Sequence, residues 1–467
     1  MKAIIIYFAI AVIAMTFFSP IPAKPEVFDV DTLVFHGDPG KFINIVILGD
    51  GYTEAELIDF KSHAESFVDY FFKKAPFSSY KNYFNVYCIY TPSIESGVKH
   101  PLTAEDCNPQ DTTHPFSNPE NFYGSTFDCA GIHRLVCPTN YSALSGVLAD
   151  NFPNYDLVFL LANSKHYGGS GGGVATATLS LASNEIAVHE IGHTFAYLAD
   201  EYWAGLQYAY EKPNMTQNNN PLTIKWKNWL PFGSGIGIYK FPGYDWYKPT
   251  EGVCEMENLN REFCAVCRET IVERIHSLVN PIMNYYPLEP ELELKDSLSF
   301  SIDLLKPQPN TLKMEWSLND NILTTHSDSV SVSAGSLKKG QNQLIAKLND
   351  TTSWVRSDSH PVEHIFYVEW TITQSDIGVF DISSEANRFS VKIYPNPVEE
   401  TVNILFDSEL ERIFNIRILS NDGKLIDNVK TNKDGEIKLD VSAYAAGAYY
   451  LEFSDGAFKH YERFIKQ

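Results

Sequence analysis

The sequence is short of basic residues, with 36 Lys and Arg against 58 Asp and Glu and a formal net charge of -22. Phosphate backbones and anionic lipid repel a chain this acidic, so nucleic acid is not an expected partner. Long apolar runs are absent after residue 23, which leaves no predicted transmembrane span beyond the first residues. There is no glycine-rich strand-to-helix fingerprint for nucleotides and no nucleophilic serine elbow. These absences argue against nucleotide-dependent enzymes, serine hydrolases and nucleic-acid binding.

The first 23 residues carry the one long apolar run. Met1 and Lys2 precede an uncharged stretch from Ala3 to Phe18, and the segment SPIPA follows at 19–23. A short basic start, an apolar core and a small-residue exit are typical of a secretory signal peptide, which we expect at residues 1–23 with cleavage near Ala23. An uncleaved amino-terminal anchor is the alternative, because the run is near the upper length of a signal core.

Cysteine is scarce, with seven residues that all precede residue 268. Export permits disulfides, and an odd count leaves at least one thiol unpaired. Cys254, Cys264 and Cys267 are compatible with a disulfide or with a structural zinc site. The disulfide is favoured, because no fourth zinc ligand is evident nearby.

Strands and a helix alternate in the first part of the chain. Residues 42–48 and 157–161 are apolar runs typical of buried strands, and residues 174–181 alternate like a half-buried strand. Thr53 and Glu56 form a capping-box pattern ahead of apolar residues at helical spacing, which predicts a helix that ends before Pro76. This order predicts a mixed α/β (α+β) catalytic domain at residues 24–287.

Beyond residue 287 the pattern changes to period-two alternation, as in Leu312, Met314, Trp316 and Leu318. Short alternating strands, turn residues between them and three Trp predict an immunoglobulin-like β-sandwich at residues 288–382. A polar stretch at residues 383–387 predicts a linker. The last module, residues 383–467, again shows short strands, so we expect a second all-β, immunoglobulin-like sandwich there.

The centre of the chain carries the segment HEIGH at 189–193. Residues four apart lie on one face of an α-helix, so the imidazoles of His189 and His193 reach a common point, which Glu190 flanks. Two neutral imidazoles at this spacing bind Zn²⁺, and the carboxylate can take a proton from a water at the metal. The alternative is a helix whose two histidines only form hydrogen bonds in a core.

A catalytic zinc ion needs a third protein ligand and an open fourth position. Asp200 is the expected third ligand, Glu201 is the alternative, and a more distant carboxylate remains open. On a straight helix Asp200 would lie roughly 10 Å along the axis from His193, so the chain must bend. The metzincin pattern has a glycine and the third ligand where this sequence has Ala196 and Ala199. Asp200 therefore comes one residue late, and a left-handed turn without glycine costs about 1 kcal/mol.

The run HEIGHTFAYLADEY at 189–202 resembles the active-site signature of the IgA-peptidase-like zinc metallopeptidases. The resemblance extends over residues 35–285 and includes GDGYT at 49–53, the aromatic strand at 83–90, SGV at 96–98 and FCAVCR at 263–268. It implies a metzincin-like zincin fold and a zinc-dependent endopeptidase with one catalytic Zn²⁺ that acts on protein or peptide substrates. No calcium motif is evident, and Ca²⁺ remains an open second ion.

A methionine-containing turn forms a hydrophobic floor under the zinc ion in metzincins. Met256 is the expected match, and Met283 is the runner-up. The alternative for either is a methionine that fills a gap in a core.

A second resemblance lies at the carboxyl-terminal end. The segments YPNP at 394–397, NDGK at 421–424, AGAYY at 446–450 and FIK at 464–466 are similar to the sorting domain of the Por (type IX) secretion system of Bacteroidetes. This resemblance implies export through the periplasm and outer membrane, with the type IX secretion machinery as a partner. We expect a monomer that is secreted or held at the cell surface.

The segment YGGSGGG at 167–173 precedes the alternating residues 174–181. It is typical of a mobile loop, and the functional alternative is that the strand after it forms the edge of the cleft, to which an extended peptide adds. His166 is either a surface residue or a group that polarises a substrate carbonyl.

Together these features predict a secreted zinc endopeptidase with Glu190 as the general base. One rival is a surface adhesin whose zinc domain is inactive, against which the intact Glu190 argues. The other is a zinc amidase that acts on peptidoglycan.

Overall fold

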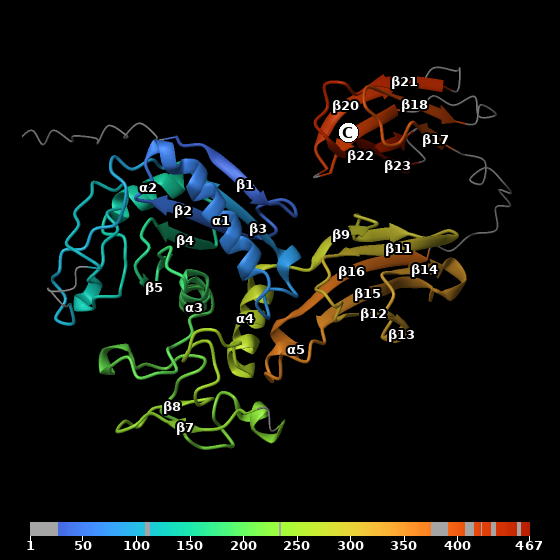
Figure 1. Ribbon diagram of the computed structural model, residues 1–467. Helices are drawn as coiled ribbons and strands as arrows, with labels where there is room; N and C mark the ends of the chain where they lie inside the picture. The colour runs from blue at the N-terminus through green and yellow to red at the C-terminus, as the bar shows by residue number, and fades with distance from the viewer. Residues whose placement is uncertain are drawn as a thin grey trace, which may run out of the picture. The chain divides into compact units, whose positions relative to one another are not determined.

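The computed structural model describes residues 27–107, 113–232, 235–374, 391–406, 415–421, 423–430, 436–454 and 459–467. The predicted signal peptide at 1–23 and the predicted linker at 383–387 lie outside these ranges. The chain divides into two compact units, Met1–Ser375 and Asp376–Gln467, which are described separately (Figure 1). Within the described ranges, no helix has the length and apolar character needed to cross a membrane.

The first unit begins with a six-stranded sheet in the order β1-β3-β2-β4-β6-β5. Its four inner strands run parallel, and the two edge strands are antiparallel to their neighbours. Every residue of β2, β3 and β4 is buried, which explains the continuous apolar runs in the sequence. The strands are β1 (Val30–Val34), β2 (Ile43–Asp50), β3 (Phe84–Ile89), β4 (Leu157–Ala162), β5 (Gly169–Ser170) and β6 (Ala175–Ala177).

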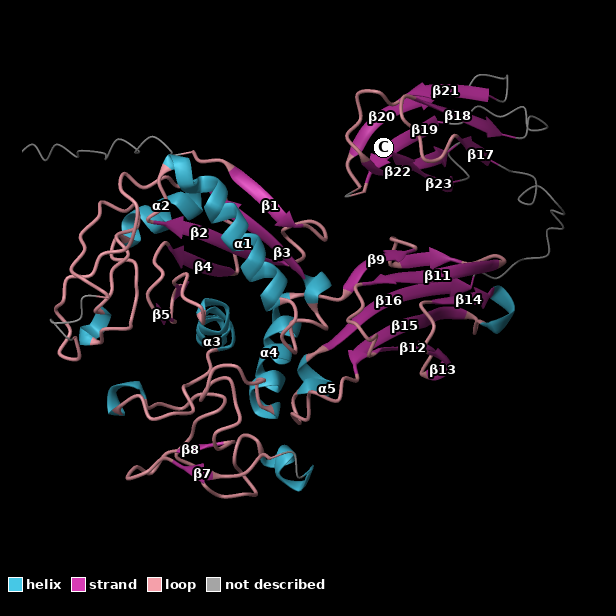
Figure 2. Cartoon of the chain, viewed as in Figure 1, coloured by secondary structure: helices cyan, strands magenta, loops and turns pink. Residues whose placement is uncertain are grey.

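Helices cover both faces of this sheet (Figure 2). Ile45 and Ile47 of β2 point into one large core with α1 (Leu57–Phe71), α3 (Ser183–Ala196) and α4 (Ala265–Leu278). Val46 and Leu48 point the other way, into a smaller core with α2 (Tyr141–Asn151). The predicted helix is α1, and the capping box of Thr53 and Glu56 forms at the short 3-10 helix η1 (Glu54–Glu56) just before it. The prediction of a mixed α/β amino-terminal region is confirmed.

The remaining segments of this region are irregular, with short helical turns and one two-stranded ribbon. These elements are η2 (Lys81–Tyr83), η3 (Cys129–Gly131), η4 (Leu206–Tyr208), η5 (Lys227–Phe232), β7 (Tyr239–Lys240) and β8 (Tyr247–Lys248).

Two further sheets complete the first unit and pack around their own core, in which Trp316 and Trp370 stack at 5.7 Å. The predicted alternation in residues 312–318 is a strand with every second residue buried. One sheet is β10 (Glu291–Glu293), β16 (Ile365–Gln374), β15 (Gly340–Asp350), β12 (Leu312–Leu318) and β13 (Asn321–Thr325); the other is β14 (Ser329–Ser333), β11 (Ser297–Leu304) and β9 (Ile282–Tyr286). The short helices η6 (Ala334–Ser336) and α5 (His360–Glu363) connect strands. The immunoglobulin-like topology itself stays a prediction.

Buried polar contacts join these sheets to the amino-terminal α/β part of the unit. Asp350, at the end of β15, accepts a hydrogen bond from Tyr80 at 2.5 Å and lies 2.9 Å from Nε2 of His276 on α4. The two parts thus belong to one compact unit, and the domain boundary at residue 287 stays a prediction.

The regular elements of the second unit, within the residues that the structure describes, are all strands. A three-stranded sheet of β17 (Val391–Tyr394), β18 (Thr401–Phe406) and β21 (Glu436–Asp440) and a four-stranded sheet of β20 (Leu425–Lys430), β19 (Asn415–Ser420), β22 (Gly447–Ser454) and β23 (Lys459–Lys466) share one core.

Candidate metal centre

Helix α3 carries the segment HEIGH and is held by its apolar face. Ile186, Val188, Ile191 and Phe195 are buried in the large core, so the helix is fixed against the sheet and α4. This packing stabilises a helix whose first residue is preceded by no side-chain cap.

The chain reverses after α3 through a left-handed residue. Tyr197 has φ 55° and ψ 29°, and the N–H of Leu198 donates to the carbonyl of Gly192 at 3.2 Å. The Leu198 carbonyl oxygen lies 2.8 Å from Nδ1 of His193. The predicted bend therefore forms without glycine, one residue later than the metzincin pattern places it.

This bend brings Asp200 to the two histidines. Oδ1 of Asp200 lies 3.0 Å from Nε2 of His189 and 3.2 Å from Nε2 of His193, and the two Nε2 atoms are 3.1 Å apart. Nδ1 of His189 lies 2.9 Å from the carbonyl of Glu255. A carbonyl at each Nδ1 fixes the tautomer that leaves both Nε2 lone pairs facing the carboxylate. Three ligand atoms thus converge on one point.

Burial and neighbouring charges shift the pKa values of the carboxyl groups of Asp200 and Glu190. Burial opposes ionisation of Asp200, but the neighbouring His193 and His189 outweigh it and hold the pKa of this carboxyl well below its usual range. Burial raises the pKa of Glu190. Asp200 is the anionic member of the group, and Glu190 is the carboxylate with the stronger tendency to hold a proton.

A cavity of about 360 Å³ opens beside His189 and Glu190. Tyr202 stacks over the His189 ring with centroids 6.4 Å apart and also lines this cavity. Arg134 lines it from a loop far away in the sequence. The full lining is Arg134, Leu135, Tyr167, Gly169, Ile186, His189, Glu190, Tyr202, Glu257 and Leu259.

The glycine-rich loop lies directly against α3. A Cβ on Gly171 would come within 2.7 Å of His193 Cβ and 2.9 Å of Glu190 Oε2. The strand after the loop is shorter than predicted, since β6 spans only Ala175–Ala177. β5 pairs with β6 on the side away from β4 and is the last strand of the sheet. In the alternative interpretation of this segment, a peptide adds to the strand at 174–181; the structure does not support it, because β6 has β4 on one side and β5 on the other.

Met256 lies under the HEIGH segment of α3. It is fully buried, and its Sδ would be 2.7 Å from a Cβ on Gly192, between the two histidines. Its carbonyl accepts the N–H of Glu201 at 2.7 Å. Met283 lies on β9, in a sheet of the second core. The geometry thus favours Met256 over Met283.

Glu201 points away from the histidines into a buried group of cysteines. Its Oε1 lies 3.3 Å from Sγ of Cys267 and 3.7 Å from Sγ of Cys264, and Cys254 Sγ is 3.7 Å from Cys267 Sγ. No disulfide joins these cysteines, so the favoured prediction for them is wrong. The disulfide in the structure is Cys129–Cys137, which the sequence did not indicate.

The sequence alone did not single out Arg134 and Tyr202, which line the cavity. Tyr202 is the last residue of the run HEIGHTFAYLADEY, so its proximity to the histidines could have been predicted. No local sequence pattern points to Arg134. The ring of His166 stacks on His114 at 3.7 Å and does not line the cavity. The structure thus offers no support for His166 as a carbonyl-polarising group.

Two family models match the chain. Residues 32–238 match IgA Peptidase M64, and residues 392–467 match the Secretion system C-terminal sorting domain. Both resemblances noted in the sequence are confirmed. The first match supports a peptidase of a metallopeptidase family, and the second indicates type IX export to the cell surface or the exterior. Met256 and the three buried cysteines lie beyond the peptidase match.

Comparisons with whole chains add little. Among curated proteins none matches this sequence. Dimeric latent PorU from Porphyromonas gingivalis is similar at 15% identity and TM-score 0.19, over 40% of this chain and 20% of that chain. A Bacteroides ovatus mixed-linkage glucan utilization protein, SGBP-B, is similar at 12% identity and TM-score 0.16, over 38% of this chain and 42% of that chain. The chain thus spans less than half of the length of either structure, and neither likeness defines its fold.

Proposed function

We propose that the protein is an exported, zinc-dependent endopeptidase with a metzincin-like catalytic domain. His189, His193 and Asp200 are its zinc ligands, and Glu190 is its general base. The observation that carries this proposal is the triangle of ligand atoms, 3.0 to 3.2 Å apart, with Glu190 beside it in an open cavity.

The ligand set fits zinc. Zinc bonds of about 2.0–2.2 Å to nitrogen and oxygen at tetrahedral angles place ligand atoms about 3.3–3.5 Å apart. The three distances lie a few tenths of an ångström below this range, so an ion would need only small movements of the side chains. Two imidazoles and one carboxylate leave one position free, which is the arrangement of catalytic rather than structural zinc. A bound zinc ion would act as a Lewis acid on the scissile carbonyl and lower the pKa of water to near 7.

The residues around the ligands have separate tasks. The Glu190 carboxylate takes the proton from the attacking water and returns it to the nitrogen of the leaving amine. The raised pKa of Glu190 suits a group that must both hold and release this proton. Tyr202 and Arg134 line the cavity where the carbonyl would lie and can donate hydrogen bonds to it.

Gly169, on β5, forms part of the cavity wall. Its N–H and carbonyl are already bonded to Arg134 and Val136, so β5 has no free edge here to which a peptide could add. The endopeptidase assignment in this proposal rests on the resemblance to the IgA-peptidase family.

One experiment separates peptidase, amidase and adhesin. The full-length purified protein is incubated with a diverse peptide library and, in parallel, with peptidoglycan fragments, before and after chelation and zinc return. Zinc-restored cleavage of library peptides supports the proposal. Cleavage of peptidoglycan amides alone identifies the amidase, and no cleavage with zinc bound identifies the adhesin.

A further inference from the structure

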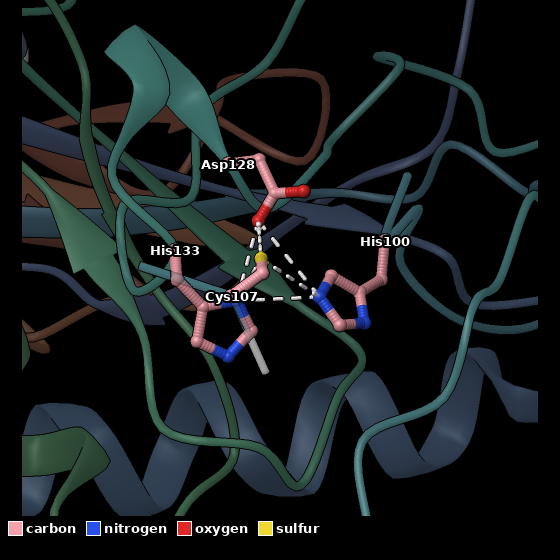
Figure 3. A group of neighbouring side chains, drawn as sticks. All are labelled: His100, Cys107, Asp128 and His133. Atoms are coloured by element: carbon pink, nitrogen blue, oxygen red, sulfur yellow. Dashed lines mark hydrogen bonds and ion pairs between the residues drawn. The ribbon is translucent and has the colours of Figure 1, made fainter. Parts of the chain in front are cut away.

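Four side chains outside the candidate catalytic centre converge in the long connection between β3 and α2. His100, Cys107, Asp128 and His133 point their ligand atoms at one another (Figure 3). Their three donor types, His nitrogen, Cys sulfur and carboxylate oxygen, are the ones that zinc prefers.

All six separations among the four ligand atoms are short. Asp128 Oδ1 and His133 Nδ1 each lie 3.2 Å from Cys107 Sγ and 3.2 Å from each other. His100 Nε2 lies 3.2 Å from His133 Nδ1, 3.8 Å from Asp128 Oδ1 and 3.9 Å from Cys107 Sγ. A tetrahedral zinc site with one thiolate has ligand separations of about 3.3–3.6 Å. The four atoms therefore form a near-tetrahedron around a point that a zinc ion would fit.

Neighbouring groups hold two of these ligands in that orientation. The carbonyl of Pro115 lies 2.9 Å from Nδ1 of His100, which leaves Nε2 with its lone pair toward the group. The other oxygen of Asp128 accepts the N–H of Thr103 at 2.7 Å. Both side chains are almost fully buried. Ligands oriented by second hydrogen bonds are typical of metal sites.

The same residues do not form a nucleophilic triad. In a triad the histidine uses one ring nitrogen for the nucleophile and the other for the carboxylate. Here Nδ1 of His133 faces both Cys107 Sγ and Asp128 Oδ1 at 3.2 Å. Convergence on a single nitrogen fits a shared cation and not a proton relay.

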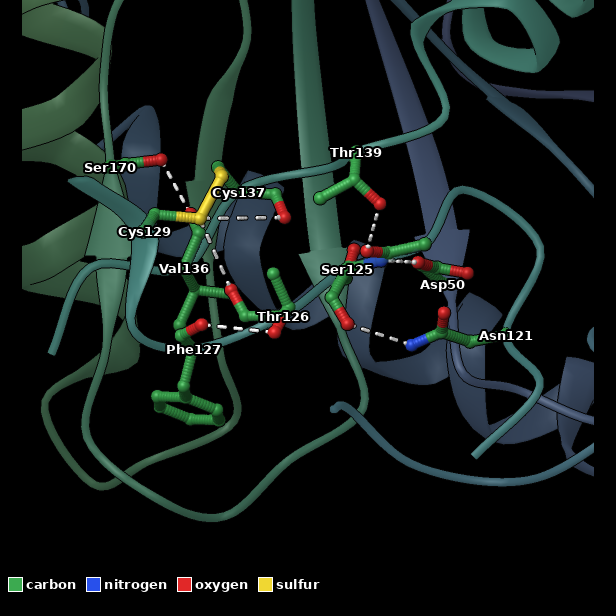
Figure 4. The surroundings of a disulfide bond; sticks show 11 residues. Asp50, Asn121, Ser125, Thr126, Phe127, Cys129, Val136, Cys137, Thr139 and Ser170 are labelled. Atoms are coloured by element: carbon green, nitrogen blue, oxygen red, sulfur yellow. Dashed lines mark hydrogen bonds between the residues drawn. A yellow bond between two sulfur atoms is a disulfide. The ribbon is translucent and has the colours of Figure 1, made fainter. Parts of the chain in front are cut away.

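We propose that His100, Cys107, Asp128 and His133 bind a structural zinc ion, separate from the catalytic one. With four protein ligands the site has no open position, so it serves folding and not catalysis. Its position explains how a connection with little regular structure is held. The disulfide Cys129–Cys137 encloses His133 and lies directly after Asp128, and the backbone N–H of Ser125 donates to Asp50 of β2 (Figure 4).

The proposed ion would also shape the catalytic cavity. Arg134 and Leu135 follow His133 directly and line that cavity. The N–H of Gly169, on β5, donates to the carbonyl of Arg134 at 3.2 Å. A metal that fixes His133 therefore fixes one wall of the cavity and the edge strand beside it.

The test is zinc content per full-length chain, measured by mass spectrometry of the metal. Cys107→Ala should hold one zinc fewer than Cys88→Ala, the matched control that removes a buried free cysteine on β3. Equal zinc in the two variants would overturn the proposal. His133→Ala serves as the second variant, because its side chain is 30% exposed and its removal disturbs packing least.

A measurement on the wild-type protein tests the same proposal if these variants do not fold. Alkylation of Cys107 by iodoacetamide, followed by peptide mass mapping, should be slow in the zinc-loaded protein and at least tenfold faster after chelation. The same rate before and after zinc removal would contradict a metal-bound sulfur.

A second group of potential metal ligands lies elsewhere in the fold. It consists of Glu201, Cys254, Cys264 and Cys267. All four ligand atoms lie within 4.8 Å of one another and all four residues are buried. Cys264 is the N-cap residue of α4 and Cys267 lies in its first turn, so the start of one helix carries two of the three sulfurs. The N–H of Cys264 donates to Sγ of Cys254 at 3.3 Å, which orients this sulfur within the group.

We infer that this group also binds a zinc ion, with three thiolates and the Glu201 carboxylate as ligands. Such a site would protect three reduced thiols in an exported protein, where exposed thiols tend to oxidise. Glu201 directly follows Asp200, so the ion would also hold the segment that carries the third catalytic ligand.

Thiol counting tests this second site. Seven cysteines less the two of Cys129–Cys137 leave five free thiols. The denatured, unreduced chain should therefore titrate five thiols, and Cys267→Ala should hold one zinc fewer than Cys88→Ala. A count of three, or unchanged zinc in Cys267→Ala, would overturn the inference.

Discussion

The carboxylate of Asp200 lies 3.0 Å from Nε2 of His189, eleven residues earlier in the chain. Tyr197 makes this approach feasible by ending α3 in the left-handed conformation. The bend and Asp200 are each one residue later than in the metzincin pattern. The two shifts compensate, so an extra helical residue leaves the ligand within reach.

Substitutions at Tyr197 should reveal the backbone strain of this bend. Tyr197→Gly should match or exceed the wild type in stability, because glycine adopts φ 55° freely. Tyr197→Val should be less stable than Tyr197→Gly by about 1–2 kcal/mol. Urea unfolding of both variants measures the difference. Equal stability would show that the bend carries no such strain.

Asp200→Asn should bind one zinc ion fewer than the wild type, because a neutral amide is a poor zinc ligand. Its kcat/KM for peptide cleavage should fall by about 100-fold or more. The matched control is Asp245→Asn, which removes an exposed carboxylate with a side chain that is 84% accessible. Zinc content and kcat/KM are measured on the same preparations. Full activity in Asp200→Asn would assign the third ligand elsewhere.

Gly171→Ala should impair catalysis. Its Cβ would lie 2.7 Å from His193 Cβ and 2.9 Å from Glu190 Oε2, so the loop or the general base must move. A displacement of about 1 Å costs up to about 100-fold in rate. Gly173→Ala is the control in the same loop, since no atom lies within 4 Å of its added Cβ. The prediction fails if the two variants have the same kcat/KM.

The contact between α4 and α5 should make stability fall in acid. Burial alone would raise the pKa of Glu273, but hydrogen bonds from His360 and His364 outweigh it and lower the pKa to about 2. A carboxyl with a lowered folded-state pKa stabilises the fold above its ordinary value of 4.5, and this contribution is lost as the pH falls toward 2. The unfolding free energies of wild type and Glu273→Gln should therefore converge as the pH falls from 4.5 to about 2.

The control for removal of a charge is Glu291→Gln, an exposed position on β10. A difference between wild type and Glu273→Gln that is independent of pH would contradict the assigned ion pair.

Patterns that depend on one element were predictable from the sequence. The runs at β2 and β4 are continuous because helices cover both faces of the sheet, and the α1 stripe has the helical period because one face of the helix is buried. The strand expected at 174–181 is only Ala175–Ala177, because its pairing with β4 stops at Ala177 and the N–H of Leu179 bonds to Ser164, beyond the end of β4. Periodicity does not report where a backbone leaves a sheet.

The same limit applies to the sites. His189, Glu190 and His193 share one helical turn, so their spacing alone predicts a common point. Glu201 reaches the cysteines only because the chain bends at Tyr197. The group at His100 draws its ligands from separate positions of an irregular connection with no known ligand spacing, so only the folded chain brings them together.

The most direct test of the central claim is kcat/KM on a peptide found in the library, measured for wild type and Glu190→Gln with zinc content determined in both. We predict that Glu190→Gln keeps all its zinc and loses about 10²- to 10⁴-fold in kcat/KM, because only the proton transfer is removed. Cleavage at the wild-type rate by zinc-loaded Glu190→Gln would contradict the proposed mechanism.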